Sequence, residues 1–230
     1  MITGAIFDVD GVLLDSIEAW EEVDTRYLQA QGITPDSDLA QVLLKMHMTE
    51  SVEYLRERYR LPWTPEEILA RILEMMEEYY THIIQPKEGA LDLLQELKGN
   101  GIPVTVATAG DRGLAQAGLK SSGLLPYIDE LFTCGEVGAG KESPAVYQAA
   151  WRSMGTELSG TWVFEDSLHG VITAGRAGFP TVGVYDKASE GNMGQMRENS
   201  TYYMMDFQER DGFYALAGFP GRDAGGFGKR

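Results

Sequence analysis

Four carboxylate side chains stand in two closely spaced pairs, each directly after a short apolar run of the 230-residue chain. Asp8 and Asp10 follow the first of these runs, and Glu165 and Asp166 follow a later one. Crowded carboxylates repel one another, so such a group is stable only when it binds a cation or shares a proton. Ligand sets made only of oxygen favour a hard cation, and Mg²⁺ with several retained waters fits best. The two pairs therefore predict a magnesium site.

A hydroxyl, an ammonium and glycine-containing turns follow two further apolar runs. Thr108 ends one of these runs and is followed by Ala109 and Gly110, and Lys141 comes soon after another, behind the turn over residues 138–140. Hydroxyl, ammonium and backbone N–H groups are the parts that hold a tetrahedral phosphate beside a metal. The sequence thus predicts a phosphate site that adjoins the magnesium site.

Short apolar runs alternate with helical patterns along most of the chain. The predicted strands cover residues 2–8, 103–107, 130–133, 160–164 and 181–184. The predicted helices between them include residues 90–98, 115–121, 144–154 and 168–177. This alternation with short connections is typical of an α/β fold with a parallel sheet covered by helices. Ligands of such sheets collect at the carboxyl ends of the strands, where all the polar residues named above lie.

Residues 17–85 interrupt this alternation directly after the first strand. Three helical stretches, residues 18–31, 38–59 and 65–84, and no convincing strand are found there. Thr64 followed by Pro65 and two glutamates is a strong helix start, because it combines a polar cap, a first-turn proline and early acids. We therefore expect a helical cap inserted at residues 17–85, in a core formed by residues 1–16 and 86–230.

Composition limits the classes of partner. The formal net charge is −16, which argues against nucleic acid or an anionic membrane surface, since both require a positive face. No apolar stretch approaches the roughly 20 residues that span a bilayer. Cys134 is the single cysteine and forms no intrachain disulfide, so a cytoplasmic location is expected. We expect a monomer or a small homo-oligomer.

Four motifs in order resemble those of the haloacid dehalogenase superfamily, in its branch of phosphatases and β-phosphoglucomutase-like enzymes with a helical cap. The motifs are residues 7–12 (Phe-Asp-Val-Asp-Gly-Val), Thr108 at a strand end, Lys141 followed by Pro144 and Tyr147, and residues 163–167 (Val-Phe-Glu-Asp-Ser). The resemblance implies a Rossmann-like three-layer core and a Mg²⁺-dependent phosphotransferase that acts on a small phosphorylated metabolite.

The resemblance also implies catalytic roles. Asp8 would attack phosphorus and form an aspartyl phosphate, which is a known use of carboxylate nucleophiles. Asp10 would protonate the leaving oxygen and then act as a general base. Lys141 would offset negative charge at the transferring phosphoryl group. Simple phosphate-transfer ATPases and dehalogenases of this superfamily have no acid/base carboxylate at the position of Asp10. The presence of Asp10 therefore favours a phosphatase or mutase.

Binding roles follow from the same resemblance. Mg²⁺ would be held by the Asp8 carboxylate, the Asp10 backbone carbonyl and Asp166, with Glu165 as a further ligand or as a partner of one. The Thr108 hydroxyl and the N–H groups of Ala109 and Gly110 would bind phosphoryl oxygens. Within the predicted cap, Lys45 and His47 are candidates for contact with substrate.

Two departures from the mutase pattern favour a phosphatase. Mutases of this family carry an arginine in a glycine-rich cap segment, whereas residues 44–50 here contain neither arginine nor glycine. Mutases also present a lysine soon after the second motif, where this chain has Asp111 and Arg112. The prediction is therefore a phosphatase with a sugar phosphate among its candidate substrates. The alternatives are a β-phosphoglucomutase-type mutase and a non-catalytic, receiver-like Mg²⁺-binding module.

Overall fold

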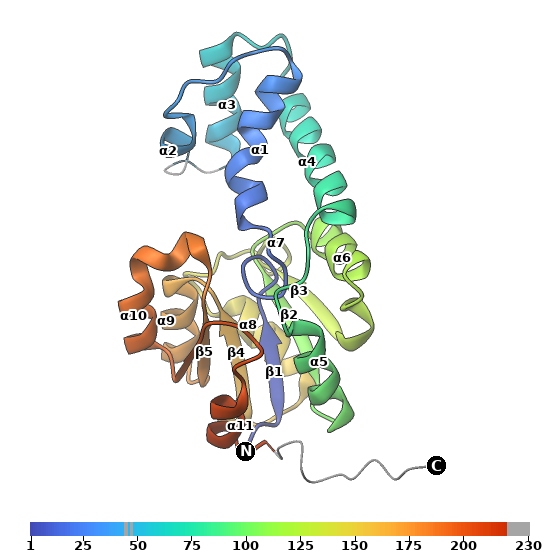
Figure 1. The fold of residues 1–230 in the computed structure, drawn as a ribbon, viewed down its shortest axis with the longest axis vertical. Helices are drawn as coiled ribbons and strands as arrows, with labels where there is room; N and C mark the ends of the chain where they lie inside the picture. The colour runs from blue at the N-terminus through green and yellow to red at the C-terminus, as the bar shows by residue number, and fades with distance from the viewer. Residues whose placement is uncertain (44–45, 47, 220–230) are drawn as a thin grey trace. The chain divides into compact units, whose positions relative to one another are not determined.

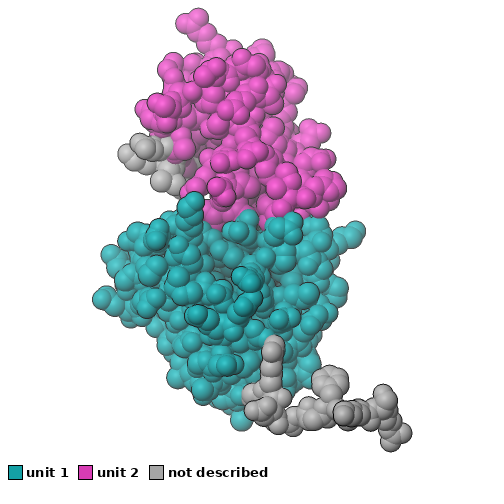
Figure 2. Space-filling view, viewed as in Figure 1, with its two compact units in different colours: residues 1–15, 85–230 teal, residues 16–84 magenta. Residues whose placement is uncertain are grey.

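The computed structural model describes residues 1–43, 46 and 48–219 and separates into two compact units (Figure 1). One unit, called the core unit below, comprises Met1–Asp15 and Gln85–Arg230. The other, called the helical unit, comprises Ser16–Ile84 (Figure 2). Lys45 and His47, the candidate substrate contacts, lie outside the described residues.

A six-stranded parallel sheet forms the centre of the core unit, with the strand order β3-β2-β1-β4-β5-β6. The strands are β1 (Gly4–Phe7), β2 (Val104–Thr108), β3 (Glu130–Thr133), β4 (Thr161–Glu165), β5 (Thr181–Val184) and β6 (Tyr202–Met204). The predicted α/β fold is confirmed. β1 and β4, which precede the two acidic pairs, are neighbours at the middle of the sheet, with Phe7 paired with Phe164.

Helices cover the sheet on both faces, as the α/β pattern requires (Figure 1). They are α5 (Ala90–Gly99), α6 (Arg112–Ser121), α7 (Cys134–Val137), α8 (Ala145–Met154), α9 (Leu168–Arg176), α10 (Met193–Asn199) and α11 (Asp211–Ala217). α8 packs against β1, β2 and β3, and α9 packs against β4 and β5. The sequence prediction did not include β6, α7, α10 and α11.

Side chains of the central strands alternate between two apolar layers. Phe7 and Phe164 stack with ring centroids 4.2 Å apart, and Phe213 meets Phe164 edge to face at 5.4 Å. On the other face, Ile6 and Val163 belong to a buried cluster with residues of α8. Because both faces of these strands are buried, their sequences are continuously apolar up to the residue where each strand ends.

The helical unit consists of α1 (Ile17–Ala30), α2 (Leu39–Leu43), α3 (Met48–Tyr59) and α4 (Pro65–His82). α4 packs against α1 and α3. Its start is a capping box, in which the Thr64 side chain accepts from the Glu67 N–H and the Glu67 carboxylate accepts from the Thr64 N–H. The expectation of one helix over residues 38–59 is wrong, because Met46 is not helical and separates α2 from α3. No helix in the described part of either unit is long and apolar enough to cross a membrane.

One buried hydroxyl of the helical unit predicts a stabilising substitution. Tyr27 is 1% exposed, and its hydroxyl has no hydrogen-bond partner among the described residues. An unsatisfied buried hydroxyl costs about 1–3 kcal/mol, so Tyr27→Phe is expected to raise the unfolding free energy by about 1 kcal/mol. Thermal denaturation measures this change. The matched control is Tyr147→Phe, which removes a hydroxyl that donates to Glu165 and is expected to lower stability.

Candidate active site

Three carboxylates converge where β1 and β4 end. Asp8 directly follows β1, Glu165 is the last residue of β4, and Asp166 comes next. The Asp8 N–H donates to the Phe164 carbonyl at 3.0 Å, which continues the sheet pairing by one residue. One carboxylate oxygen from each of the three residues lies within 4.8 Å of the others, and all three residues are buried. The pairing of the two central strands is therefore what brings these carboxylates together.

Lys141 joins two of these carboxylates through ion pairs. Its ammonium lies 2.6 Å from Asp8 Oδ2 and 2.6 Å from Glu165 Oε1. Burial alone would lower the pKa of Lys141, but the two carboxylates outweigh it and the pKa is raised. The lysine is thus a permanent cation at the centre of the site.

Glu165 has partners on both carboxylate oxygens. The Tyr147 hydroxyl donates to Oε1 at 2.7 Å, and the Ser167 hydroxyl donates to Oε2 at 2.9 Å. A Cβ atom on Gly170 would lie 2.5 Å from Oε2, so glycine there leaves room for the carboxylate. Three residues therefore hold the Glu165 carboxylate in place: Tyr147 of α8, Ser167 at the start of α9, and Lys141.

The donor set fits a divalent cation. Asp8 Oδ1 is buried and has no hydrogen-bond partner within the described part of the chain. Burial raises the pKa of Asp8 well above its usual value; Lys141 opposes this rise, and the neighbouring carboxylates add to it. Three carboxylates against one ammonium leave an excess of negative charge. An unpaired oxygen beside the Asp166 carboxylate in an all-oxygen cluster is what a hard dication requires, so the residues present fit Mg²⁺.

Metal affinity is expected to depend on pH. Burial, together with Glu165, raises the pKa of Asp166 to about 7 in the metal-free protein. Below that pH the carboxyl holds a proton that must leave before the oxygen binds a metal. We expect the apparent affinity for Mg²⁺ to fall by at least about tenfold per pH unit below pH 7, because the pKa of Asp8 is raised as well and its carboxyl also has to lose a proton. Calorimetric titration at several pH values measures this, and an affinity that is constant between pH 5.5 and 8 would contradict it.

Asp10, Thr108 and Gly110 form a second group close to the carboxylates. A Cβ atom on Gly110 would lie 3.1 Å from Asp10 Oδ2 and 3.3 Å from Thr108 Oγ1. The Gly110 N–H donates to Thr108 Oγ1 at 3.0 Å, and Ala109 is exposed between them. Asp10 also raises the pKa of Asp8 electrostatically. The structure thus brings the predicted phosphate loop and the two aspartates to one place.

A tight turn positions Asp10. The N–H groups of Val12, Leu13 and Leu14 all donate to the Val9 carbonyl. Gly11 adopts a φ of 76°, a left-handed backbone conformation that residues other than glycine rarely adopt. Asp10 lies beyond the end of β1, so this turn, and not the alternation of side chains along a strand, sets its direction.

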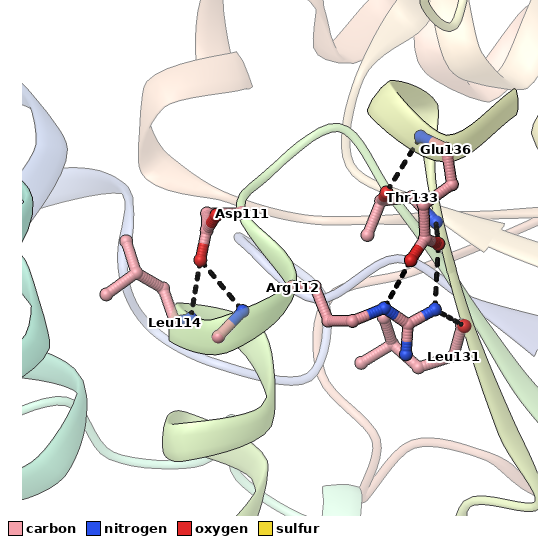
Figure 3. A network of polar contacts seen from close by, with 7 residues as sticks. Asp111, Arg112, Leu114, Leu131, Thr133 and Glu136 are labelled. Carbon is pink, nitrogen blue, oxygen red and sulfur yellow. Dashed lines mark hydrogen bonds and ion pairs between the residues drawn. The ribbon is translucent and has the colours of Figure 1, made fainter. Parts of the chain in front are cut away.

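Arg112 forms an ion pair with Glu136 (Figure 3). Its guanidinium donates to both carboxylate oxygens of Glu136, at 2.5 and 2.7 Å, and to the Leu131 carbonyl. Glu136 also forms the capping box of α7 with Thr133. This bidentate pair links the start of α6 to α7, so the Arg112 guanidinium is already engaged within the core unit.

Sequence reasoning did not assign a role to several residues around the site. Lys87 lies 2.5 Å from Asp186 Oδ2, and Asp186 contributes to the raised pKa of Asp166. Tyr147 and Ser167 appeared only as parts of two motifs, and Ser167 is also the N-cap of α9. The contact of Tyr147 with Glu165 depends on how α8 packs against the sheet and has no local signal, whereas Ser167 lies only two residues after Glu165.

Known proteins show similarity over most of the chain. A family model described as haloacid dehalogenase-like hydrolase matches residues 5–184. Hexitol phosphatase A from Escherichia coli (strain K12) is 30% identical over 183 residues, which cover 79% of this chain and 82% of the relative. Validoxylamine A 7'-phosphate phosphatase from Streptomyces hygroscopicus subsp. limoneus is 28% identical over 184 residues, covering 78% of this chain and 84% of the relative.

The fold has a close counterpart among solved structures. A protein from Thermotoga maritima that is provisionally assigned as a β-phosphoglucomutase superimposes with a TM-score of 0.82 at 23% identity, over 94% of this chain and 99% of that one. At this identity the likeness bears on the fold alone. The family match covers the four motifs, and the sheet order brings those motifs together. The chain therefore belongs to the haloacid dehalogenase-like hydrolase family, as its motifs predicted.

Proposed function

We propose that the protein is a Mg²⁺-dependent phosphatase that hydrolyses a small phosphorylated metabolite through an aspartyl phosphate on Asp8. The observation that carries the proposal is the asymmetry of the Asp8 carboxylate. Oδ2 is paired with the Lys141 ammonium, whereas Oδ1 is buried without a hydrogen-bond partner among the described residues. One oxygen is thus suited to a metal, and the other lies beside a cation that can receive a phosphoryl group.

The chain's own residues account for the first step. Asp8 Oδ2 attacks phosphorus, and Lys141 at 2.6 Å neutralises charge on the transferring group. Glu165 holds the lysine in that position through its own 2.6 Å ion pair. Thr108 and the adjoining loop would hold the remaining phosphoryl oxygens. Asp8 Oδ1 and Asp166 would hold Mg²⁺, which, when bound, supplies further charge neutralisation and orientation of the phosphoryl group.

Asp10 supplies the proton that the leaving oxygen requires. Its carboxylate is near the Gly110 backbone and the Thr108 hydroxyl, and it is partly exposed, so it can exchange protons with solvent. In the second step Asp10 removes a proton from a water molecule, which attacks the aspartyl phosphate and releases inorganic phosphate. Both steps need the same carboxylate, first as an acid and then as a base.

The names of the relatives support a polyhydroxylated substrate. One is named for hexitol phosphates and another for validoxylamine A 7'-phosphate. We therefore include sugar and polyol phosphates as the first substrates to test. A role of the helical unit as a specificity cap follows from the family resemblance and stays a prediction.

Phosphate release from a panel of sugar phosphates, polyol phosphates and p-nitrophenyl phosphate tests the proposal. With Mg²⁺ we expect turnover, and with EDTA we expect none. Asp10→Asn is expected to lower kcat by about 10²–10⁴, the usual contribution of general acid–base catalysis. Isomerised sugar phosphate without phosphate release would favour the mutase alternative. A stable phosphoprotein without turnover would favour the receiver-like module.

A further inference from the structure

Tyr147 extends from an apolar layer of the core unit to the acidic site. The residue is fully buried, and it belongs to the cluster that contains Ile6, Val163 and other residues of α8. Its hydroxyl donates to Glu165 Oε1 at 2.7 Å. Burial, together with the negative charge of Glu165, raises the pKa of Tyr147, so the hydroxyl keeps its proton and remains a donor. Phenylalanine would fill the same apolar space, and the hydroxyl is therefore the part of this side chain that serves the site.

The Glu165 carboxylate is held by donors from three segments. Oε1 accepts from the Tyr147 hydroxyl and is paired with the Lys141 ammonium at 2.6 Å. Oε2 accepts from the Ser167 hydroxyl at 2.9 Å. Both oxygens are thus engaged within the protein, and rotation of the carboxylate would leave buried polar groups without partners, which is costly. Glu165 is therefore a fixed anchor for the Lys141 ammonium.

Lys141 needs such an anchor because its other ion pair is lost during the proposed reaction. The ammonium ends a flexible four-carbon stem, and Asp8 Oδ2 and Glu165 Oε1 each hold it at 2.6 Å. When the bond between Asp8 Oδ2 and phosphorus forms, the bond from phosphorus to the leaving oxygen breaks. The leaving oxygen takes a proton from Asp10, and the Asp8 carboxylate loses its charge to the new bond. Of the two carboxylates that the structure pairs with Lys141, Glu165 alone then stays charged.

We propose that Tyr147 is a positioning residue for phosphoryl transfer, which fixes Glu165 and thereby keeps the Lys141 ammonium at the phosphoryl group after Asp8 has been phosphorylated. Tyr147 acts through Glu165 and is not itself a catalytic residue. The inference deepens the proposed function and rests on it for the role of Lys141. The contacts that connect Tyr147 to Lys141 are measurable without turnover.

Tyr214→Phe is a matched control for Tyr147→Phe. Tyr214 is likewise buried, at 5% exposure, and its hydroxyl also donates to a glutamate, Glu96. It lies in α11, whose last residue, Ala217, accepts a hydrogen bond from the Ile2 N–H just before the start of β1 (Figure 1). The control hydroxyl therefore belongs to a helix at the opposite end of the sheet from the carboxylates.

Steady-state kinetics of the two variants tests the proposal. We expect Tyr147→Phe to lower kcat about tenfold, the equivalent of one lost hydrogen bond. KM and the affinity for Mg²⁺ are expected to change by less than about threefold. Tyr214→Phe is expected to lower the melting temperature as much as Tyr147→Phe does, but to keep the wild-type kcat. Equal kcat for wild type and Tyr147→Phe, or an equal loss of kcat in the two variants, would overturn the proposal.

The ammonium signal of Lys141 is a second readout that needs no turnover. Heteronuclear NMR detects buried lysine ammonium groups whose protons exchange slowly, and the signal is assigned by its absence from Lys141→Arg. We expect Tyr147→Phe to shift this signal and to speed its exchange with solvent, and Tyr214→Phe to leave it unchanged. Asp8→Asn removes the charge that phosphorylation also removes, so the effect of Tyr147→Phe is expected to be larger in that background.

The two readouts distinguish failure of this inference from failure of the proposed function. Absence of phosphate release by the wild type would refute the proposed function, and the NMR signal would still decide whether Tyr147 fixes Lys141. A Lys141 signal that Tyr147→Phe leaves unchanged, both in the wild-type and in the Asp8→Asn background, would overturn the inference whatever the activity.

Discussion

Asp8→Asn is expected to abolish phosphate release, with kcat falling by at least about 10⁵, the largest effect of any single substitution considered. The amide is close in shape to the carboxylate but is a far poorer nucleophile. It also removes the oxygen charge that Asp8 Oδ1 offers to a metal and breaks the ion pair of Oδ2 with Lys141. Steady-state kinetics with the best substrate of the panel gives the size of the loss.

The covalent intermediate is the second readout for Asp8. Rapid acid quench followed by intact-mass analysis is expected to show one added phosphoryl group on wild type and none on Asp8→Asn. Asp15→Asn is the matched control, because this exposed aspartate follows in the same loop and its side chain lies 3.8 Å from Lys87 in a loose ion pair. Turnover by Asp8→Asn within tenfold of wild type would exclude Asp8 as the nucleophile.

Lys141→Met is expected to lower both activity and stability. Removing one charge-stabilising group from a transition state costs about 10²–10³ in kcat. The variant also leaves Asp8 and Glu165 buried without their shared cation, and breaking a buried ion pair in this way costs about 3–5 kcal/mol. Kinetics and urea denaturation measure the two effects separately.

A double variant separates the two roles of Lys141. Lys141→Met with Glu165→Gln removes both partners of one ion pair, so stability is expected to recover in part while activity stays low. Lys120→Met, at an exposed position of α6, is the control for loss of a lysine charge. If the single variant kept wild-type stability, the two ion pairs of Lys141 would be unimportant for the fold.

Residues with a strong local signal were predictable from sequence. Asp8 and Asp166 were found because each follows an apolar run that is long enough for a central strand, and the parallel fold then places their strand ends together. The start of α4 was found because Thr64 and Pro65 form a capping pattern that needs no tertiary contact. In contrast, β6 has three residues and becomes a strand by pairing with β5, so its sequence alone carries little information.

Features that depend on tertiary packing were not predictable. The acidic residues of α1 have the pattern of a solvated helix face, yet Asp24 lines a cavity. Two of the three partners of Glu165, Tyr147 and Lys141, come from an earlier part of the chain, and their contact with Glu165 depends on how α8 packs against the sheet. Such contacts are decided by burial and distance, which sequence spacing does not encode.

The two chain crossings between the units lie next to each other, because the Asp15 N–H donates to the Gln85 carbonyl at 2.9 Å. The helical unit is therefore inserted between two neighbouring residues of the core unit. A helical segment grafted from another family member needs to span only the short distance between these two residues. Substitution of a single continuous segment, residues 16–84, would leave the carboxylates, Lys141 and the sheet unchanged. In evolutionary terms, this architecture lets the helical segment be exchanged or diverge as a module while the chemistry of the core is inherited intact.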